Sequence, residues 1–353
     1  MKILPVNTKN SCNFLLSQLT LLLLISSQLT SSLATSSWDQ WWAYDGISGP
    51  DYWGIINPKW SHCSKGRKQS PIDINPDSLL FDPGLEPIQM NKIKDTIHGN
   101  LINTGRGLQL SVIGNSSVTI TSGPLSYQYS INHMILHYGT EVDRGSEHKI
   151  NGIAFPGELQ LYFYNSQLYH NWTQAAQESN GLAVIAVLIH IAATPEEEST
   201  AIALNSIVKS IEHIKLEGTS HKLESVDIHK LLPTLEHYIT YEGSLTEPPC
   251  HETVQWIVLN KPLYATNNQL SLIRNSLIID GYGDNYRPIQ STNYRCVRTN
   301  ILREFNTTLD EITSQSMKGN HEFNKKRLCG NKGYVTYKAN IKRDLDDGNS
   351  VGN

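Results

Sequence analysis

Two histidines that could act as metal ligands lie near the middle of the sequence. His133 and His137 both belong to the alternating stretch Leu125–Tyr138, which predicts a long β-strand with the two side chains on one face. Four residues of strand span about 13 Å, whereas the ligand nitrogens of one zinc ion lie at most about 4 Å apart. The two histidines therefore cannot share a zinc ion without a large distortion of the strand.

The elements that must position these histidines are mostly strands. Strand patterns dominate from about residue 101 to residue 259. Gly157–Tyr164 predicts a further strand, and Ala183–Ile191 is a continuous apolar run, which is typical of a strand buried on both faces. Leu108–Ile113 and Ser117–Thr121 are joined through Gly114–Asn115, so they predict a hairpin.

Helices are few in this pattern. Thr194–Glu197 is a capping box with proline at the first helical position, and Thr266–Gln269 begins a second predicted helix. Many strands with few helices predict a single domain, mainly β with peripheral helices, over residues 38–295. Residues 296–353 become charged and rich in Gly and Asn, which predicts an extension that is loose at its end.

The first 34 residues have the pattern of a secretory signal peptide. A basic start is followed by the Leu-rich run Phe14–Ile25 and by small residues at Ser32–Ala34. The run is shorter than the roughly 20 residues that a membrane-spanning helix needs, so we expect cleavage and secretion rather than anchoring. No later segment is predicted to span a membrane, and the net charge of -4 argues against nucleic acid as a partner.

Cysteine usage fits an extracellular protein. Removal of the leader leaves an even set of cysteines, as expected in an oxidising compartment: Cys63, Cys250, Cys296 and Cys329. Three N-x-S/T sequons would be available there for glycosylation: Asn115, Asn171 and Asn306.

Five colinear segments resemble a known family. They are Gln69–Ile74, Gly145–His148, Gly181–Val184, Gly243–Thr246 with the following prolines, and Asn285–Pro288. Together they resemble the α-carbonic anhydrases from about Trp41 to Arg295. The resemblance implies a central, mostly antiparallel sheet of about ten strands with helices at its periphery.

Enzymes of this family hold Zn²⁺ with three histidines and a water whose pKa the metal lowers to about 7. Their ligands occur in a His-x-His-Trp-Gly pattern and a Glu-Leu-His pattern. Here the first pattern has Ile135 and His137, and the second ends in Gln160. A hydrocarbon cannot coordinate metal and a neutral amide oxygen is a poor zinc donor, so we expect no zinc and no other cofactor.

Two further departures concern the proton path and the substrate pocket. Arg106 occupies the position that the resemblance assigns to the proton shuttle, and arginine stays charged near neutral pH. Tyr162 occupies the position of a small apolar residue beside the carbon dioxide pocket. Its ring would fill much of that space.

Other site positions are retained. Glu147 and Thr246 match the hydrogen-bonded pair that orients zinc-bound hydroxide, and Glu158 matches the carboxylate that holds the third histidine. The residues that match the apolar pocket wall are Val184, Leu245, Val254 and Trp256. We expect these side chains to persist because they are packed and hydrogen-bonded, whether or not catalysis survives.

The resemblance also implies a Cys63–Cys250 disulfide. The stretch Arg295–Asn300 resembles secreted, inactive carbonic anhydrase-related proteins of the nervous system, the tenth and eleventh human types. That branch suggests an extracellular or cell-surface protein of the neurexin receptor type as a partner. The sequence thus predicts an inactive, secreted binding protein.

Two alternatives of a different class remain. One is a carbonate dehydratase (lyase) with a residual or unconventional zinc site. The other is a sensor that binds a small molecule in the old cleft, although Tyr162 would reduce the space for it.

The last two cysteines lead to a first prediction. We expect Cys296 to pair with Cys329 inside the chain, so the secreted protein should run at monomer mass on a gel both with and without reductant. A band of twice that mass that disappears on reduction would instead indicate that one of these thiols links two chains.

Overall fold

The computed structural model describes residues 41–91, 96–114, 118–277 and 283–302. The predicted signal peptide, Cys329 and the sequons at Asn115 and Asn306 lie outside these residues. From Trp42 onward the described residues belong to one compact unit, which is the subject of the following paragraphs.

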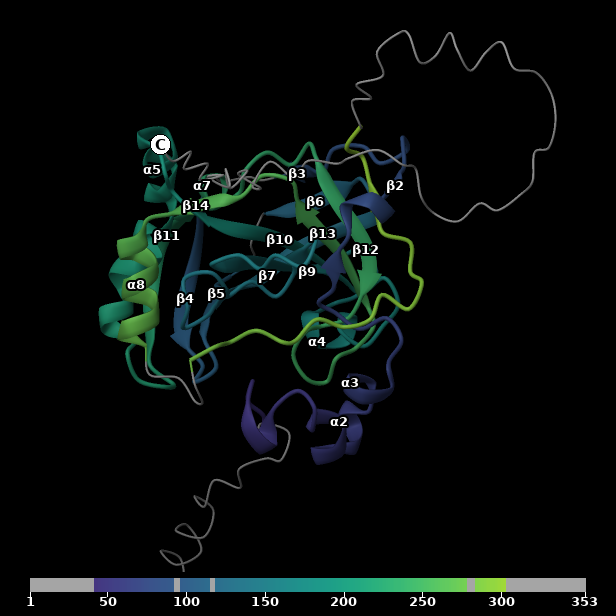
Figure 1. Cartoon of the computed structure of the whole chain (residues 1–353), viewed down its shortest axis with the longest axis horizontal. Coiled ribbons are helices and arrows are strands. Elements are labelled where there is room, and N and C mark those ends of the chain that lie inside the picture. Colours follow the sequence, from purple (N-terminus) through teal and green to yellow (C-terminus); the bar gives the residue numbers. More distant parts are fainter. Residues whose placement is uncertain (1–40, 92–95, 115–117, 278–282, 303–353) are drawn as a thin grey trace, which may run out of the picture. The chain divides into compact units, whose positions relative to one another are not determined.

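A 13-stranded sheet dominates the unit, with its central strands side by side in Figure 1. Its main path is β11-β4-β5-β7-β9-β10-β13-β12-β15-β2. Most pairs are antiparallel, whereas β10 is parallel to β13 and β14, and β15 is parallel to β2. The strands are β2 (Leu80–Phe81), β3 (Gln89–Asn91), β4 (Thr96–Asn103), β5 (Leu108–Val112), β6 (Thr119–Ser122), β7 (Leu125–Tyr138), β9 (Gly157–Asn165), β10 (Leu182–Ile191), β11 (Ser220–Asp227), β12 (Tyr238–Gly243), β13 (Val254–Leu259), β14 (Leu263–Ala265) and β15 (Arg298–Thr299).

This architecture confirms the expected mainly β fold, with thirteen strands where about ten were expected. The sheet includes β15, which lies in the predicted extension. A separate two-stranded parallel sheet joins β1 (Asp73–Ile74) to β8 (Lys149–Ile150).

The predicted hairpin is wrong. β5 and β6 do not pair with each other; both lie along the same edge of β7, where Leu108 pairs with Leu136 and Thr119 with Ser130. The reason is the length of β7, whose 14 residues offer one half of the strand to each partner.

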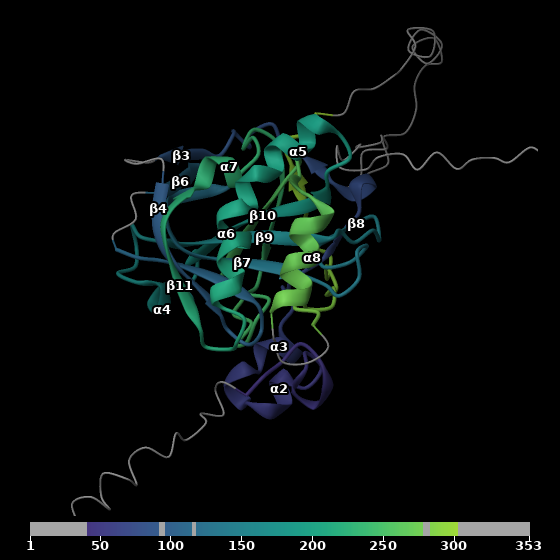
Figure 2. The ribbon, with the colours of Figure 1, turned by 90° about the vertical axis from the view of Figure 1, so that its left-hand side faces the viewer.

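The sheet has two buried faces with different roles. Along β9, Leu159 and Leu161 belong to a large apolar core on one face, while Glu158, Gln160 and Tyr162 point to the other, since strand side chains alternate. Helices α6 (Asn205–Ser210) and α8 (Asn267–Ser276) add apolar residues to the first core and lie over the sheet in Figure 2. The second face carries the polar site. As predicted, β10 is buried on both faces along most of its length.

The remaining helices are short. The predicted capping box at Thr194 is present before α5 (Pro195–Ala201), and the predicted helix start at Thr266 is also a capping box, before α8. Among the described residues no helix has the length and apolar character needed to cross a membrane. The other helical segments are α2 (Trp53–Ile56), α3 (His62–Lys65), α4 (Trp172–Ala175), α5 (Pro195–Ala201), α7 (Ile228–Leu231) and the 3₁₀ turns η3 (Gly46–Ser48), η4 (Pro58–Trp60), η5 (Pro76–Ser78), η6 (Ile202–Leu204) and η7 (Ile211–His213).

The aromatic N-terminal arm is joined covalently to the domain. Cys63 and Cys250 form the expected disulfide, and both pack with the buried indoles of Trp53 and Trp60. Because Cys250 follows β12, this bridge holds the arm against the loop that enters the polar site. Cys296 is exposed, and its predicted pairing stays a prediction because its expected partner lies outside the described residues.

Candidate functional site

The three positions that would carry zinc histidines meet on β7 and β9. Ile135 pairs with Gln160, and His137 pairs with Glu158, so that all four side chains share one face of the sheet. Both His137 and Gln160 are completely buried. The fold therefore brings together the positions that the resemblance selected, but with an imidazole, an amide and a hydrocarbon in place of three imidazoles.

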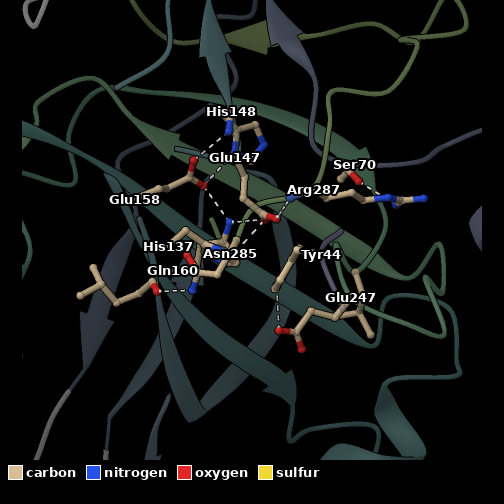
Figure 3. Close-up of polar contacts among 12 residues, drawn as sticks. Tyr44, Ser70, His137, Glu147, His148, Glu158, Gln160, Glu247, Asn285 and Arg287 are labelled. Carbon is tan, nitrogen blue, oxygen red and sulfur yellow. Dashed lines mark hydrogen bonds and ion pairs between the residues drawn. The ribbon is translucent and has the colours of Figure 1, made fainter. Parts of the chain in front are cut away.

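Both ring nitrogens of His137 contact oxygen atoms (Figure 3). Nδ1 lies 2.6 Å from the backbone carbonyl oxygen of Asn285, and Nε2 lies 3.1 Å from Oε1 of Gln160. Nε2 is also 3.6 Å from the Glu147 carboxylate. The nitrogen that would face a metal in an active enzyme here faces protein oxygens.

The Gln160 amide joins most of the groups in the site. Its nitrogen donates to Glu147 and to Glu158, at 2.8 Å each. Its oxygen accepts from the Tyr162 hydroxyl and lies against His137. Because an amide oxygen turned toward two carboxylates would be repelled, these contacts fix which end of the amide faces His137.

This orientation bears on the charge of His137. A backbone carbonyl and an amide oxygen are both acceptors, so these two contacts favour a proton on each ring nitrogen. Burial alone would lower the pKa of His137, but the Glu147 carboxylate, the Asn285 carbonyl and the Glu158 carboxylate outweigh burial and raise it. The contacts and the raised pKa of His137 therefore both favour the charged form of the ring.

A second histidine stabilises Glu158. The carboxylate accepts from the backbone N–H and from Nδ1 of His148, at 2.8 Å each. Burial would raise the pKa of Glu158, but the charge and hydrogen bond of His148 lower it to about 2. The other nitrogen of His148 lies 2.7 Å from the Tyr241 hydroxyl, which donates to Ser70.

The expected hydrogen bond between Glu147 and Thr246 is not formed. One Glu147 oxygen accepts from the Arg287 backbone N–H at 3.0 Å and the other accepts from Gln160. Thr246 Oγ1 is buried near the Tyr162 phenol but makes no hydrogen bond of ordinary geometry within the described residues. The competing amide of Gln160 explains the loss of this pair.

The expected pocket wall needs a correction. A cavity of about 430 Å³ remains above the site, and Tyr162 and Leu245 line it. Val184, Val254 and Trp256 do not; they are buried in the apolar core that also contains Tyr162. Tyr162 pairs with Val184 across the strands, and its large side chain fills the space that would have exposed the deeper residues.

Arg106 does not point freely into solvent. Its Nε donates to the Trp42 carbonyl at 2.7 Å, and its guanidinium lies 4.5 Å from the centre of the Trp42 ring. His133, the other candidate ligand, stacks on Tyr162 with ring centres 4.5 Å apart. Burial lowers the pKa of His133 to about 3, so it is neutral at physiological pH.

Sequence reasoning missed several members of the site. His148 and Asn285 lie in two of the segments that carried the family resemblance, which was the available signal for a role. Glu247 accepts from the Tyr44 hydroxyl at 3.1 Å, and no local pattern joins residues so far apart in the chain. Within the described parts of the chain, no three His, Cys, Asp or Glu side chains are grouped to hold a metal ion.

The sequon at Asn171 lies beside the cavity. Asn171 is exposed and caps α4, where its side-chain oxygen accepts from the Gln174 backbone N–H at 2.9 Å. A glycan attached to the amide nitrogen would leave this oxygen available. Glycosylation at this position stays a prediction.

The first prediction from this geometry concerns Gln160. Gln160→Leu removes the donor between two buried carboxylates and the acceptor of the Tyr162 hydroxyl, so we expect the free energy of unfolding to fall by roughly 3–5 kcal/mol. Gln109→Leu, at a half-buried position on β5, is the matched control and should cost about 1 kcal/mol or less. Equal losses in urea denaturation would contradict the bridging role.

The second prediction concerns pH. A pKa raised above the unfolded value of about 6.5 means that His137 stabilises the fold fully below that pH and loses this contribution as pH rises through its folded-state pKa. NMR of the ring nitrogens should show His137 still doubly protonated above pH 6.5. The exposed His229→Gln variant controls for loss of a histidine. A neutral His137 ring at pH 6 would refute the charge assignment.

Comparison with known proteins agrees with this geometry. The family model for eukaryotic-type carbonic anhydrases matches residues 48–301. The chain is also 37% identical over 279 residues to carbonic anhydrase-like protein 2 of Caenorhabditis elegans, in an alignment that covers 73% of this chain and 78% of that protein. The resemblance to the two human types stays a prediction. The chain belongs to the eukaryotic-type carbonic anhydrase family.

Proposed function

We propose that this protein is secreted, holds no zinc, does not hydrate carbon dioxide, and acts outside the cell as a binding protein. The observation that carries the proposal is the Gln160 amide, whose nitrogen and oxygen are both engaged by neighbouring side chains at the position of a zinc ligand.

The donor set does not fit zinc. A structural or catalytic zinc ion needs three or four nitrogen, sulfur or carboxylate donors in tetrahedral directions. His137 would have to give up its contact with Gln160, and Ile135 offers only hydrocarbon. Zinc would also have to displace a proton from His137, and the raised pKa of that ring opposes the displacement.

Substrate space and proton transfer support the same proposal. Tyr162 is almost completely buried and occupies the floor of the cleft where a small apolar residue would leave room for carbon dioxide. Arg106 is held against Trp42 and is always charged, so it cannot relay protons from the site.

A role outside the cell is supported by the disulfide and by the N-terminal pattern. The Cys63–Cys250 bridge is of the kind that persists in oxidising compartments, and the leader pattern directs a chain there. The branch of the family that this chain resembles suggests a cell-surface receptor, such as one of the neurexin type, as the partner.

Metal content is the decisive measurement. We expect the purified secreted protein to contain far less than one zinc ion per chain and to show no carbon dioxide hydration above background. A zinc-binding member of the family, purified in the same buffers, is the control. Stoichiometric zinc together with hydration that a sulfonamide inhibits would overturn the proposal and favour a lyase with an unconventional site.

Variants that restore the missing histidines test the same prediction. Ile135→His with Gln160→His should restore zinc binding. Turnover should also require Tyr162→Val, because this change opens the pocket and removes a hydroxyl that Gln160→His would leave without its acceptor. The single variant Tyr162→Val is the control and should bind no zinc.

A further inference from the structure

A second groove, with no lining residue in common with the cavity beside Gln160, lies where α5, η6, α7 and β14 meet. Three of these elements, α5, α7 and β14, are close together in Figure 1. The groove has a volume of about 930 Å³. Leu232, Pro262 and Leu263 are buried and form an apolar floor, whereas the Ile202 side chain remains 62% exposed at its edge. The described residues therefore leave an apolar surface uncovered.

The charged side chains that line this groove are positive. Lys230 and Lys261 line it and are exposed, and no Asp or Glu is among the described lining residues. Two carboxylates contact lining residues from outside. Asp227 lies 3.4 Å from the largely exposed Lys230, and Glu197, which interacts with Tyr264, accepts two backbone N–H groups at the start of α5. A segment that fills the groove should therefore combine an apolar face with acidic side chains.

The described part of the chain ends close to the same groove. The Asn300 side chain donates to the Glu236 carbonyl at 2.7 Å and accepts from the Tyr238 backbone N–H at 3.1 Å. Glu236 follows Thr234, which lines the groove, by two residues. Leu302, the last described residue, follows Asn300 by two residues and is exposed. Because two residues of extended chain span at most about 7 Å, the chain after residue 302 begins within reach of the groove.

The next segment of the sequence has the required pattern. Residues 305–312 lie outside the described residues and contain Asp310 and Glu311 but no basic residue. Their large apolar side chains recur at the i, i+4, i+7 spacing that places them on one face of a helix: Phe305, Leu309 and Ile312. The sequon residue Asn306 would be about 100° around that helix from its neighbour, so a glycan there would lie beside the apolar face rather than on it.

We propose that residues 305–312 dock in this groove of the same chain as an amphipathic helix. The apolar face lies on the floor and the acidic pair lies beside Lys230 and Lys261, whose long side chains extend along the helix. Tethering favours this segment over other occupants, because a linker of two residues holds it at an effective concentration on the order of millimolar. The inference is independent of the proposed loss of zinc, since the groove and the old zinc position have no residue in common.

Zero-length cross-linking of the full secreted chain tests the contact. A carbodiimide joins a lysine amine to a carboxylate that touches it, and mass spectrometry identifies the joined peptides. We expect Lys230 or Lys261 to be linked to Asp310 or Glu311 at every protein concentration. An equimolar mixture of ordinary and ¹⁵N-labelled chains identifies the source: links within one label indicate the same chain, whereas mixed links indicate a second copy.

Hydrogen exchange with variants measures the docking. The backbone N–H groups of residues 305–312 should exchange at least about tenfold more slowly than in an unstructured peptide. Leu309→Asp and Ile202→Glu should each remove this protection, because each puts a charge into the apolar contact. Ile341→Asp, elsewhere in the extension, and Leu216→Glu, at a side chain that is 59% exposed outside the groove, are the matched controls and should leave it unchanged.

Three results would overturn the inference. They are exchange of the segment at the unstructured rate in the unaltered protein, protection that persists in both Leu309→Asp and Ile202→Glu, and cross-links that are absent or that join only different chains. Agreement of the unfolding midpoints shows that each variant is folded. Leu309→Asp lies outside the described domain, so its result stands even if Ile202→Glu is destabilised.

Discussion

The buried carboxylates of Glu147 and Glu158 are the constraint on which the site depends. Two such charges on one face of a sheet are costly unless cations and donors surround them. In this chain the Gln160 amide donates to both carboxylates, His137 lies beside Glu147 with a raised pKa, and His148 hydrogen-bonds to Glu158. His137 and Gln160 thus stand at two of the three positions that carry zinc histidines in active members of the family.

The rest of the fold positions the residues of this hydrogen-bond network. Its members come from β7, from β9, from the loop before β8 and from the segment around Asn285, so the sheet register and the long loops must all be correct for the hydrogen bonds to form. Helices α6 and α8 and the larger apolar core lie on the opposite face of the sheet. The Cys63–Cys250 bridge secures the arm near the same loops.

The cleft beside the changed zinc-ligand positions also differs from that expected of an active enzyme. Tyr162 lines the floor of the cavity, and its hydroxyl donates to Gln160 in the network below. In this chain the cavity is lined by the rings of His133, Tyr162 and Trp172 and by the carboxyl group of Glu247.

The sequence by itself determined the family, the mainly β class, both capped helix starts, the Cys63–Cys250 pair and the ligand positions that have changed, because each of these depends on short patterns or on residue chemistry. Only the tertiary structure decided that β5 and β6 share one edge of β7. It also decided that Gln160, rather than Thr246, donates a hydrogen bond to Glu147, and that Glu247 lines the cavity. These features join residues that are distant along the chain. Their partners are selected by competition among buried donors and acceptors, which no local pattern records.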